Sequence, residues 1–405
     1  MYYKKFVALF LSGIILVSCG APSHSDIAKN KISEFLKDHA EMSIIYDIEV
    51  GGKNVASGAQ GLSDRSSGTK LDLNSNVPIA SATKTITAAL ILKLQEKGML
   101  TIYDKLTKFF EEDSEWWPNG KAPSWAHDIT IHHLLSNTSG LDEYVFSMKI
   151  DPSMGLEGAK KFAFAQIAKS DLSIIPGEKY IYTNSNYFLL GLIAEKVTGK
   201  ELGELYKEEF FTPLGMENTH LASFEEATNY QRGALETLPR PYFAVTTDAG
   251  ITYVDAKADF FFIPFSDGGI VSTVKDMMIW NKALHQGKIL SEFSYKIMTT
   301  PYNEIPDRLC EKSYYGYGIK ISDFGNGTIM YFHPGVFMGI RSEQGYIPTA
   351  NIYFAALSNV MVQRSVTNEL TDNKDNQILK LDIEFFRKSM ADLAQEIISP
   401  QHQKP

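Results

Sequence analysis

The chain has strand-like segments near both of its ends and a long, mostly helical stretch between them. Residues 43–50 and 55–62 are typical of two strands joined by the turn Gly51-Gly52-Lys53-Asn54. Four further strand-like runs lie near the other end, at Tyr315–Ile321, Gly327–His333, Val336–Tyr346 and Asn351–Ser358. The simplest packing joins both groups into one antiparallel sheet, with the middle of the chain inserted into it. The sequence therefore predicts an α+β fold.

Two terminal helices are expected to cover one face of this sheet. Residues 24–40 carry apolar side chains at helical spacing, among them Ile27, Ile32 and Phe35, and residues 376–397 form a second amphipathic segment. We predict a sheet lobe over residues 25–105 plus 300–397 and a mostly helical lobe over residues 106–299. A cleft between two such lobes is a usual place for an active site.

The N-terminus has the pattern of a secretory signal. Lys4 and Lys5 precede an apolar run that ends just before Cys19, and this run is too short to span a membrane. The small residue before Cys19 resembles the bacterial lipoprotein signal, and ordinary cleavage near Ser18 or Gly20 is the alternative. We expect a signal peptide over residues 1–18, a tether over 19–24 and a tail over 398–405. The protein is then exported from a bacterial cell, lipid-anchored at Cys19, and periplasmic or extracytoplasmic.

Charge and composition exclude some partners. The formal net charge of the chain is −9, and no basic patch stands out, so nucleic acid is not an expected partner. Besides Cys19 the chain has only Cys310, so a lipidated Cys19 leaves no disulfide. His132 and His133, with His127 nearby, have irregular spacing and no matching acidic or cysteine set, so no metal is expected. No cofactor is implied.

Ser81-Ala82-Thr83-Lys84 opens a helix with one apolar face. Residues three apart lie one helical turn above each other, so the Ser81 hydroxyl and the Lys84 amine are expected to meet. A serine beside a lysine that gives up its proton is a way to build a nucleophile without histidine, and the helix N-terminus stabilises negative charge there. The alternative is that Ser81 is a plain helix cap.

The same Ser-x-x-Lys spacing occurs twice more. Ser67 and Lys70 lie in a polar stretch that is typical of a turn. Ser272 and Lys275 lie at the start of another helix, where Thr273 and Asp276 have the spacing of a capping box. Both have structural explanations, so the spacing alone does not decide between them and Ser81.

Two further motifs carry polar side chains. Tyr182-Thr183-Asn184 is the only Tyr-x-Asn in the chain and lies on a loop before an apolar helix, and His333-Pro334-Gly335 lies between two late strands. Taken alone, a buried tyrosine with a turn asparagine, and a histidine at a strand end, are the simpler interpretations. Gly335 would let backbone or substrate approach closely.

In this order, the three motifs resemble those of the serine β-lactamase and penicillin-binding-protein-like superfamily. The likeness is to its branch of class C β-lactamases, D-Ala-D-Ala carboxypeptidases, D-aminopeptidases and esterases. Connecting segments are similar to family blocks as well, at residues 129–141, 211–216, 267–272 and 315–318. Because Ser272 falls within a different block, the resemblance identifies Ser81 as the nucleophile.

The resemblance implies a role for each motif. Ser81 would attack a carbonyl and form an acyl-enzyme, with Lys84 as the base and Tyr182 as the group that passes the proton to the leaving group. The backbone N–H groups of Ser81 and Val336 would form the oxyanion hole. Substrate contacts are implied for Asn184 and for the third motif, at His333 and Gly335.

One departure from the family pattern bears on the substrate. Many β-lactamases carry lysine where this chain has His333, and most relatives have a hydroxyl residue where it has Pro334, which offers neither a hydroxyl nor an N–H. Efficient β-lactamase activity is therefore not expected, and Arg341 is a candidate for holding a substrate carboxylate instead. The aromatic block from Tyr253 to Phe265 is a candidate acyl pocket or, alternatively, lobe core.

We therefore expect a serine hydrolase that acts through an acyl-enzyme. The first expectation is a D-Ala-D-Ala carboxypeptidase-like peptidase of the bacterial envelope, acting on a small acyl or peptide substrate such as a peptidoglycan stem peptide. An esterase or a D-amino-acid amidase or aminopeptidase is an alternative. A catalytically silent protein that binds cell-wall peptides is another, and the membrane is the second expected partner, through the lipid anchor.

A covalent probe tests the predicted nucleophile. A fluorophosphonate or a penicillin should add its mass to Ser81, because an activated serine attacks both kinds of electrophile. Intact-protein and peptide mass spectrometry measure the added mass, and Ser81→Ala should abolish it. Failure of a whole panel of acylating probes would instead favour the silent binding protein.

Overall fold

The computed structural model describes residues 22–145, 152–172, 174–231, 237–247, 250–256, 264–364 and 382–399. Nine strands of the described chain form its largest sheet, and they come from both ends of the sequence. In spatial order they are β10 (Asn303–Ile305), β11 (Lys312–Tyr315), β12 (Lys320–Asp323), β13 (Ile329–Phe332), β15 (Ile340–Ile347), β16 (Ile352–Ser358), β1 (Ile44–Val50) and β2 (Lys53–Gln60), while β14 (Gly335–Phe337) pairs with β15 beside this path. All of these pairs are antiparallel, which confirms the predicted α+β fold.

The join between the two ends of the chain is the pairing of β1 with β16. Ile44 lies opposite Ser358, and the register continues to Val50 opposite Ile352. On its other edge β1 forms a hairpin with β2, whose tight turn is Gly51-Gly52, both with positive φ. Glycine is favoured there because other residues avoid this backbone region.

Two of the predicted late strands are wrong in detail. The run 315–321 is interrupted, because Gly318 has a φ of +64° and turns the chain between β11 and β12. The run 336–346 is a hairpin rather than one strand: Met338 and Gly339 both have positive φ and separate β14 from β15. Both runs read as continuous because their apolar residues continue through the turns.

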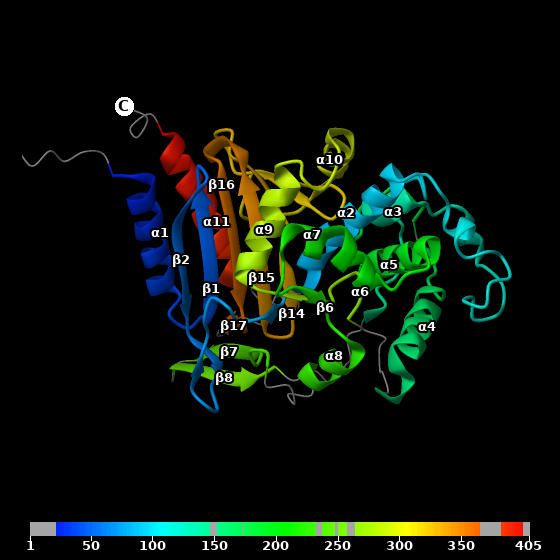
Figure 1. Ribbon diagram of the computed structural model, residues 1–405, viewed down its shortest axis with the longest axis horizontal. Coiled ribbons are helices and arrows are strands. Elements are labelled where there is room, and N and C mark those ends of the chain that lie inside the picture. The colour runs from blue at the N-terminus through cyan, green and yellow to red at the C-terminus, as the bar shows by residue number, and fades with distance from the viewer. Residues whose placement is uncertain are drawn as a thin grey trace, which may run out of the picture.

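Helices cover both faces of the sheet. In Figure 1, α1 (His24–Asp38) and α11 (Asp382–Ile398) lie along one side, while α9 (Val274–His285) and α2 (Thr83–Glu96) lie on the other. Side chains along β1 alternate between these layers: Ile44 and Ile48 pack with the terminal helices, and Ile45 packs with α2 and α9. The sheet therefore carries a separate apolar core on each face.

The rest of the described chain adds helices and two small sheets. The remaining helices are α3 (Ile131–Leu135), α4 (Gly155–Ile167), α5 (Asn184–Thr198), α6 (Leu202–Tyr206), α7 (Thr212–Leu214), α8 (Phe224–Gln231) and α10 (Glu292–Met298), with shorter turns η1 (Ala80–Ala82), η2 (Leu106–Lys108), η3 (Ser124–His127), η5 (Pro152–Met154), η6 (Lys207–Phe211) and η7 (Pro348–Ala350). One small sheet has the order β17 (Val360–Arg364), β7 (Tyr242–Thr247), β8 (Gly250–Asp255), and the other β5 (Val77–Pro78), β9 (Ile270–Ser272), β6 (His220–Leu221). A hairpin of β3 (Leu62–Asp64) and β4 (Thr69–Lys70) completes the strands of the described residues. The predicted lobe boundaries at residues 105/106 and 299/300 stay a prediction.

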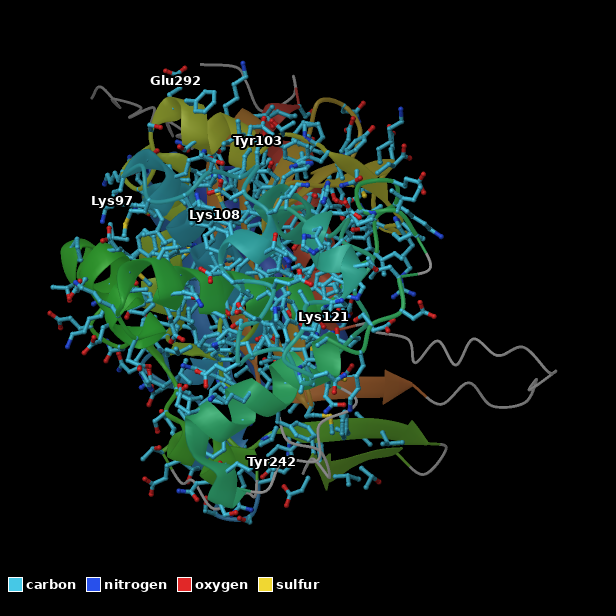
Figure 2. The ribbon with its side chains drawn as sticks, turned by 90° about the vertical axis from the view of Figure 1, so that its right-hand side faces the viewer. Lys97, Tyr103, Lys108, Lys121, Tyr242 and Glu292 are labelled. Atoms are coloured by element: carbon cyan, nitrogen blue, oxygen red, sulfur yellow. The ribbon has the colours of Figure 1, made fainter. Side chains whose placement is uncertain are left out.

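Figure 2 shows the helical side of the molecule, with Lys97, Lys108 and Lys121 exposed on it and Tyr242 near its base. No helix of the described residues is long and apolar enough to cross a membrane. The predicted signal peptide and the lipidation site Cys19 lie outside the described residues, as do residues 257–263 of the aromatic block and residues 400–405 of the predicted tail.

Gly335 is required where the sheet meets the Ser81 segment. A Cβ atom at this position would lie 2.0 Å from the Ile79 carbonyl oxygen and 2.2 Å from Ser342 Oγ. These two atoms already form a hydrogen bond of 2.6 Å, in which Ser342 donates, so neither can move aside without losing it.

Gly335→Ala should therefore lower the free energy of unfolding by about 1–3 kcal/mol, as overpacking of a core usually does. It should also slow covalent labelling of Ser81, and urea unfolding and labelling kinetics measure the two effects. Gly203→Ala is the matched control, because its added Cβ would meet no atom closer than 3.7 Å. Equal behaviour of the two variants would contradict the close-packing argument.

Candidate active site

Ser81 lies in the short helical turn η1, directly before α2. No side-chain hydrogen bond caps η1 or α2, whose N-cap positions are Ile79 and Ala82. The Ser81 hydroxyl instead accepts a hydrogen bond of 3.0 Å from Lys84 Nζ. The interpretation of Ser81 as a plain helix cap is therefore wrong.

The backbone before Ser81 is held in an unusual conformation. Ala80 has a φ of +47°, in the left-handed region that costs a non-glycine residue about 1 kcal/mol or more. Its neighbour Ile79 is fixed from two sides: the N–H donates to the Ile270 carbonyl at 2.9 Å, and the carbonyl accepts from Ser342 Oγ. The sheet thus imposes the turn that presents Ser81.

Lys84 is fully buried and is surrounded by oxygen atoms. Besides Ser81 Oγ, its Nζ donates to Asn184 Oδ1 at 2.7 Å and to the backbone carbonyl of Asp267 at 2.5 Å. Gly318 allows the sheet to come this close, because a Cβ there would lie 2.4 Å from the Lys84 carbonyl oxygen. Three segments remote in sequence therefore converge on one amine.

Burial changes the acidity of this amine. The cost of removing a charged group from water lowers the pKa of Lys84 to about 8, while the acidic Asp267 and Glu143 oppose the shift. A lysine with such a pKa is neutral in a useful fraction of molecules near neutral pH. Its lone pair can then accept a proton from Ser81.

Tyr182 lies against both members of the predicted pair. Lys84 Nζ is 5.2 Å from the centre of the Tyr182 ring. Burial raises the pKa of Tyr182, and the nearby Ser81 side chain opposes that rise. The phenol is therefore neutral and able to relay a proton. The structure brings Ser81, Lys84 and Tyr182 together as the sequence predicts, and their catalytic roles stay a prediction.

Asn184 is the first residue of α5 and is engaged by the protein. Its Oδ1 accepts from Lys84, while its backbone N–H and its Nδ2 each donate to Glu143 Oε2 at 2.9 Å. In this arrangement Asn184 positions Lys84, and its predicted contact with substrate stays a prediction. Sequence reasoning missed Glu143, although it lies only two residues beyond the recognised block 129–141.

A second acidic residue, Asp267, was also missed. Its side chain is fully buried, and burial raises the pKa of its carboxyl group. Asp267 belongs to the recognised block 267–272, yet nothing in that block indicates that its carbonyl would accept from a lysine 183 residues away. Long-range packing of this kind has no local sequence signal.

His333 is close to the site but is not a cation. Its ring is 6.3 Å from that of Tyr182, and its side chain is 2% exposed. Nδ1 lies 2.8 Å from the Pro334 carbonyl and so carries the proton, which leaves Nε2 to accept from the Tyr315 hydroxyl at 3.2 Å. Burial, followed by the nearby Lys84, holds the pKa of His333 well below its usual value. A role for this neutral histidine in binding substrate stays a prediction.

Val336 and Gly335 lie beside the Ser81 turn, on β14. A two-residue turn joins β14 to β15, so Phe337 and Ile340 form the hydrogen-bonded pair next to it. Val336, opposite Arg341, is then in the non-hydrogen-bonded position, and its N–H points away from β15. Since β14 packs on η1, this orientation suits the predicted oxyanion hole.

An apolar pocket adjoins this turn. It has a volume of about 40 Å³, and its lining includes Ala80, next to Ser81, and Phe337, next to Val336. Ala227 and Tyr230 of α8 also line it. The position and small size suit a short apolar side chain on the substrate.

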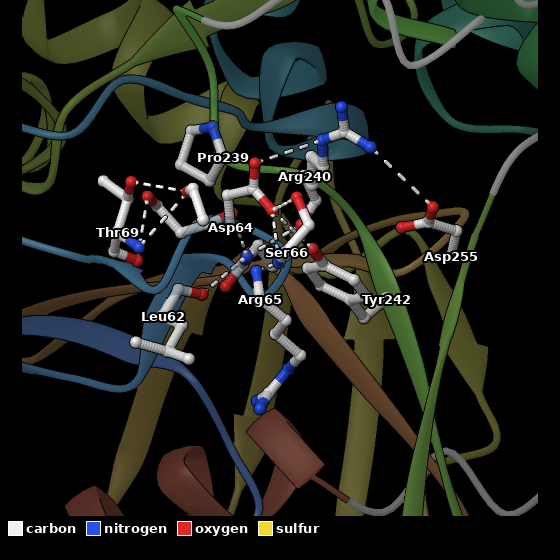
Figure 3. Close-up of polar contacts among 12 residues, drawn as sticks. Leu62, Asp64, Arg65, Ser66, Thr69, Pro239, Arg240, Tyr242 and Asp255 are labelled. Carbon is white, nitrogen blue, oxygen red and sulfur yellow. Dashed lines mark hydrogen bonds and ion pairs between the residues drawn. The ribbon is translucent and has the colours of Figure 1, made fainter.

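The two rival serines have structural roles. Ser67 is exposed in the β3–β4 hairpin, where its hydroxyl lies 2.7 Å from that of Thr69. Polar contacts tie this hairpin to the start of β7: Asp64 accepts from the Tyr242 hydroxyl and pairs with Arg240 (Figure 3).

The second rival, Ser272, is buried on β9. Its hydroxyl lies 2.8 Å from that of Thr219, and the adjacent Thr273 caps α9 by accepting from the N–H of Asp276. Among the residues that the structure describes, neither serine forms a hydrogen bond with the lysine three residues further on, whereas Ser81 does. The described residues also contain no group of three or more histidine, cysteine or acidic side chains placed to hold a metal ion.

Comparison with known proteins gives consistent matches. Residues 28–375 match the protein family described as Beta-lactamase. The chain is 28% identical to a penicillin-binding protein of Bacillus subtilis, in a match that covers 57% of this chain and 49% of that protein. It is 24% identical to the D-aminopeptidase of Brucella anthropi, in a match that covers 76% of this chain and 54% of that protein. It thus spans about half the length of these curated relatives.

Among solved structures, the octameric penicillin-binding protein homologue from Pyrococcus abyssi superimposes with a TM-score of 0.67. The two proteins are 26% identical, and the match covers 82% of this chain and 73% of the other. The fold and the sequence therefore lead to the same group of proteins.

The pKa of Lys84 predicts the pH dependence of the reaction at Ser81. Because only the neutral amine accepts a proton, the rate of labelling by a neutral fluorophosphonate should rise as pH increases through about 8. Lys84→Arg should remove this rise and at least 99% of the rate, since arginine stays protonated, a loss of about 100-fold or more for a general base. A rise centred near 6.5 in the unmodified protein would instead indicate a histidine as the base.

Proposed function

The chain belongs to the β-lactamase family and is a serine hydrolase, and we propose that it hydrolyses amides of small D-amino acids that carry a free ammonium group. Ser81 would attack the amide carbonyl while Lys84 takes its proton, and the leaving amine would receive a proton by way of Tyr182. Water would then release the D-amino acid from the acyl-enzyme.

The observation that carries this proposal is the charge around Lys84. The acidic side chain of Glu143 is only partly buried. Asn184 connects it to Lys84, because Asn184 accepts a hydrogen bond from Lys84 and donates one to Glu143. An acidic group at the mouth of a site attracts a cationic substrate and repels a carboxylate. A free α-ammonium next to the scissile carbonyl fits this arrangement.

The described residues offer little to hold a substrate carboxylate, as a carboxypeptidase would need. His333 is neutral, and Pro334 supplies no hydroxyl. Arg341 is 2% exposed, and both Arg341 and the nearby Lys320 already have interaction partners. The expected D-Ala-D-Ala carboxypeptidase activity therefore takes second place, supported by the likeness to the Bacillus subtilis penicillin-binding protein.

Two further properties of the proposed substrate have their own support. Its D configuration is supported by the likeness to a D-aminopeptidase, and its small side chain by the size of the pocket beside Ala80 and Phe337. Export, lipid attachment at Cys19, and action on peptidoglycan fragments in the envelope complete the proposal. An esterase acting on small acyl groups shares the same acyl-enzyme and remains the alternative of the same class.

Glu143→Gln tests the proposed recognition of ammonium. The variant should lose about 10-fold or more in kcat/KM for D-alanine amide relative to N-acetyl-D-alanine methyl ester, because only the first substrate carries a positive charge. The ratio of the two values is the readout, so a general loss of activity through Asn184 cancels.

Asp142→Asn is the matched control, since it removes the same charge from the neighbouring, exposed residue. Its ratio should stay close to that of the unmodified protein. An unchanged ratio in Glu143→Gln would contradict the proposal. So would an unmodified enzyme that prefers L-alanine amide to D-alanine amide, or one that releases D-alanine from D-Ala-D-Ala peptides faster than it cleaves D-alanine amide.

A further inference from the structure

Asp267 is a buried acid whose carboxylate is only partly satisfied. Its Oδ2 accepts from the Tyr144 hydroxyl at 3.1 Å, whereas Oδ1 is buried and, within the described part of the chain, has no hydrogen-bond partner. An unpaired buried oxygen of this kind is costly, so its presence calls for an explanation. The backbone carbonyl of the same residue accepts from Lys84 Nζ.

The turn that carries Asp267 cannot move away from Lys84. The Ser266 carbonyl accepts from Thr87 Oγ1 of α2 at 2.5 Å, and Ser266 Oγ donates to the Tyr187 carbonyl of α5 at 2.8 Å. Gly269 closes the turn, and a Cβ there would lie 2.4 Å from the backbone nitrogen of Phe265. The acid is therefore anchored to the two helices that carry Lys84 and Asn184.

The ionisable groups around Asp267 come from four segments. Lys84 on α2 is the cation among them, and Glu143, before α4, is a second acid. Three tyrosines face it as well: Tyr144, Tyr182 and Tyr206. Because burial raises the pKa of all three phenols, the charges that remain to interact are those of Lys84 and the two acids.

We propose that Asp267 is a positioning residue that sets the strength of Lys84 as a base. When the Ser81 oxygen bonds to a carbonyl carbon, the π bond of the carbonyl breaks and its electron pair moves to the carbonyl oxygen. The hydroxyl proton of Ser81 passes to Lys84 and creates a buried ammonium. The negative charge of Asp267 stabilises that ammonium, which water cannot reach. This inference rests on the proposed serine hydrolysis but not on the choice of substrate.

Two measurable effects follow from this arrangement. Without the negative charge, Lys84 would lose its proton at lower pH, because only Glu143 would then oppose the effect of burial on its pKa. The neutral amine would also be a weaker base, so the rate on the alkaline plateau would fall. A loss of packing or folding would lower the plateau but would not shift the pH at which the rate rises.

Asp267→Asn separates these effects, because asparagine keeps the shape and the backbone carbonyl and removes the charge. The probe is a neutral fluorophosphonate, and the measurement is its second-order rate of reaction with Ser81 as a function of pH. The midpoint should move to lower pH by about one unit or more, and the plateau should fall several-fold. Tyr144→Phe, which removes the donor to Oδ2, should move the midpoint in the same direction by less.

Asp276→Asn is the matched control, since Asp276 is also a buried acid but accepts from Asn218 and Thr219 instead of facing Lys84. Its midpoint should stay in place. An unshifted midpoint in Asp267→Asn, a shift to higher pH, or no reaction of the unmodified protein with the probe would each overturn the inference. Failure to cleave D-alanine amide, with the shift present, would overturn only the proposed substrate.

Discussion

The burial of one amine is the constraint on which the site depends. A lysine side chain withdrawn from water must be surrounded by protein oxygens, and those around Lys84 come from the starts of two helices and from a turn before β9. Such an arrangement holds only if the three segments are fixed independently of each other. The sheet fixes Ser81 through Ile79, and α2 fixes the turn of Asp267 through Thr87. The contacts that hold these segments in the fold therefore also hold the oxygen atoms around Lys84 in place.

The electrostatic design of the site follows from the same burial. His333 keeps no charge, and its two ring nitrogens are committed to Pro334 and Tyr315. The acids Glu143 and Asp267 are then the main charges near Lys84 among the described residues. A site of this polarity differs from one that binds a substrate carboxylate, although the fold is shared.

The sequence could predict the parts of this structure that are local or periodic. The contact between Ser81 and Lys84 follows from helical spacing, and the sheet built from both chain ends follows from alternating apolar residues. The turns at Gly318 and Met338-Gly339 were missed because apolar residues continue through them. Glu143 and Asp267 were missed because they reach Lys84 through contacts between remote segments. The resemblance supplied Tyr182, which spacing alone would have left as a buried aromatic residue.

The hydrogen bonds of Lys84 also explain why Ser81, among its three partners, is the one suited to the proposed role of nucleophile. A protonated amine has three hydrogens, and they match the three oxygens that surround it. On deprotonation two hydrogens remain, and the Asp267 carbonyl and the Asn184 amide oxygen can only accept. The lone pair is therefore left to point at the hydroxyl, which is the partner able to reverse from acceptor to donor. Loss of one proton thus reverses the direction of the hydrogen bond between Lys84 and Ser81 and leaves the other two hydrogen bonds of Lys84 unchanged.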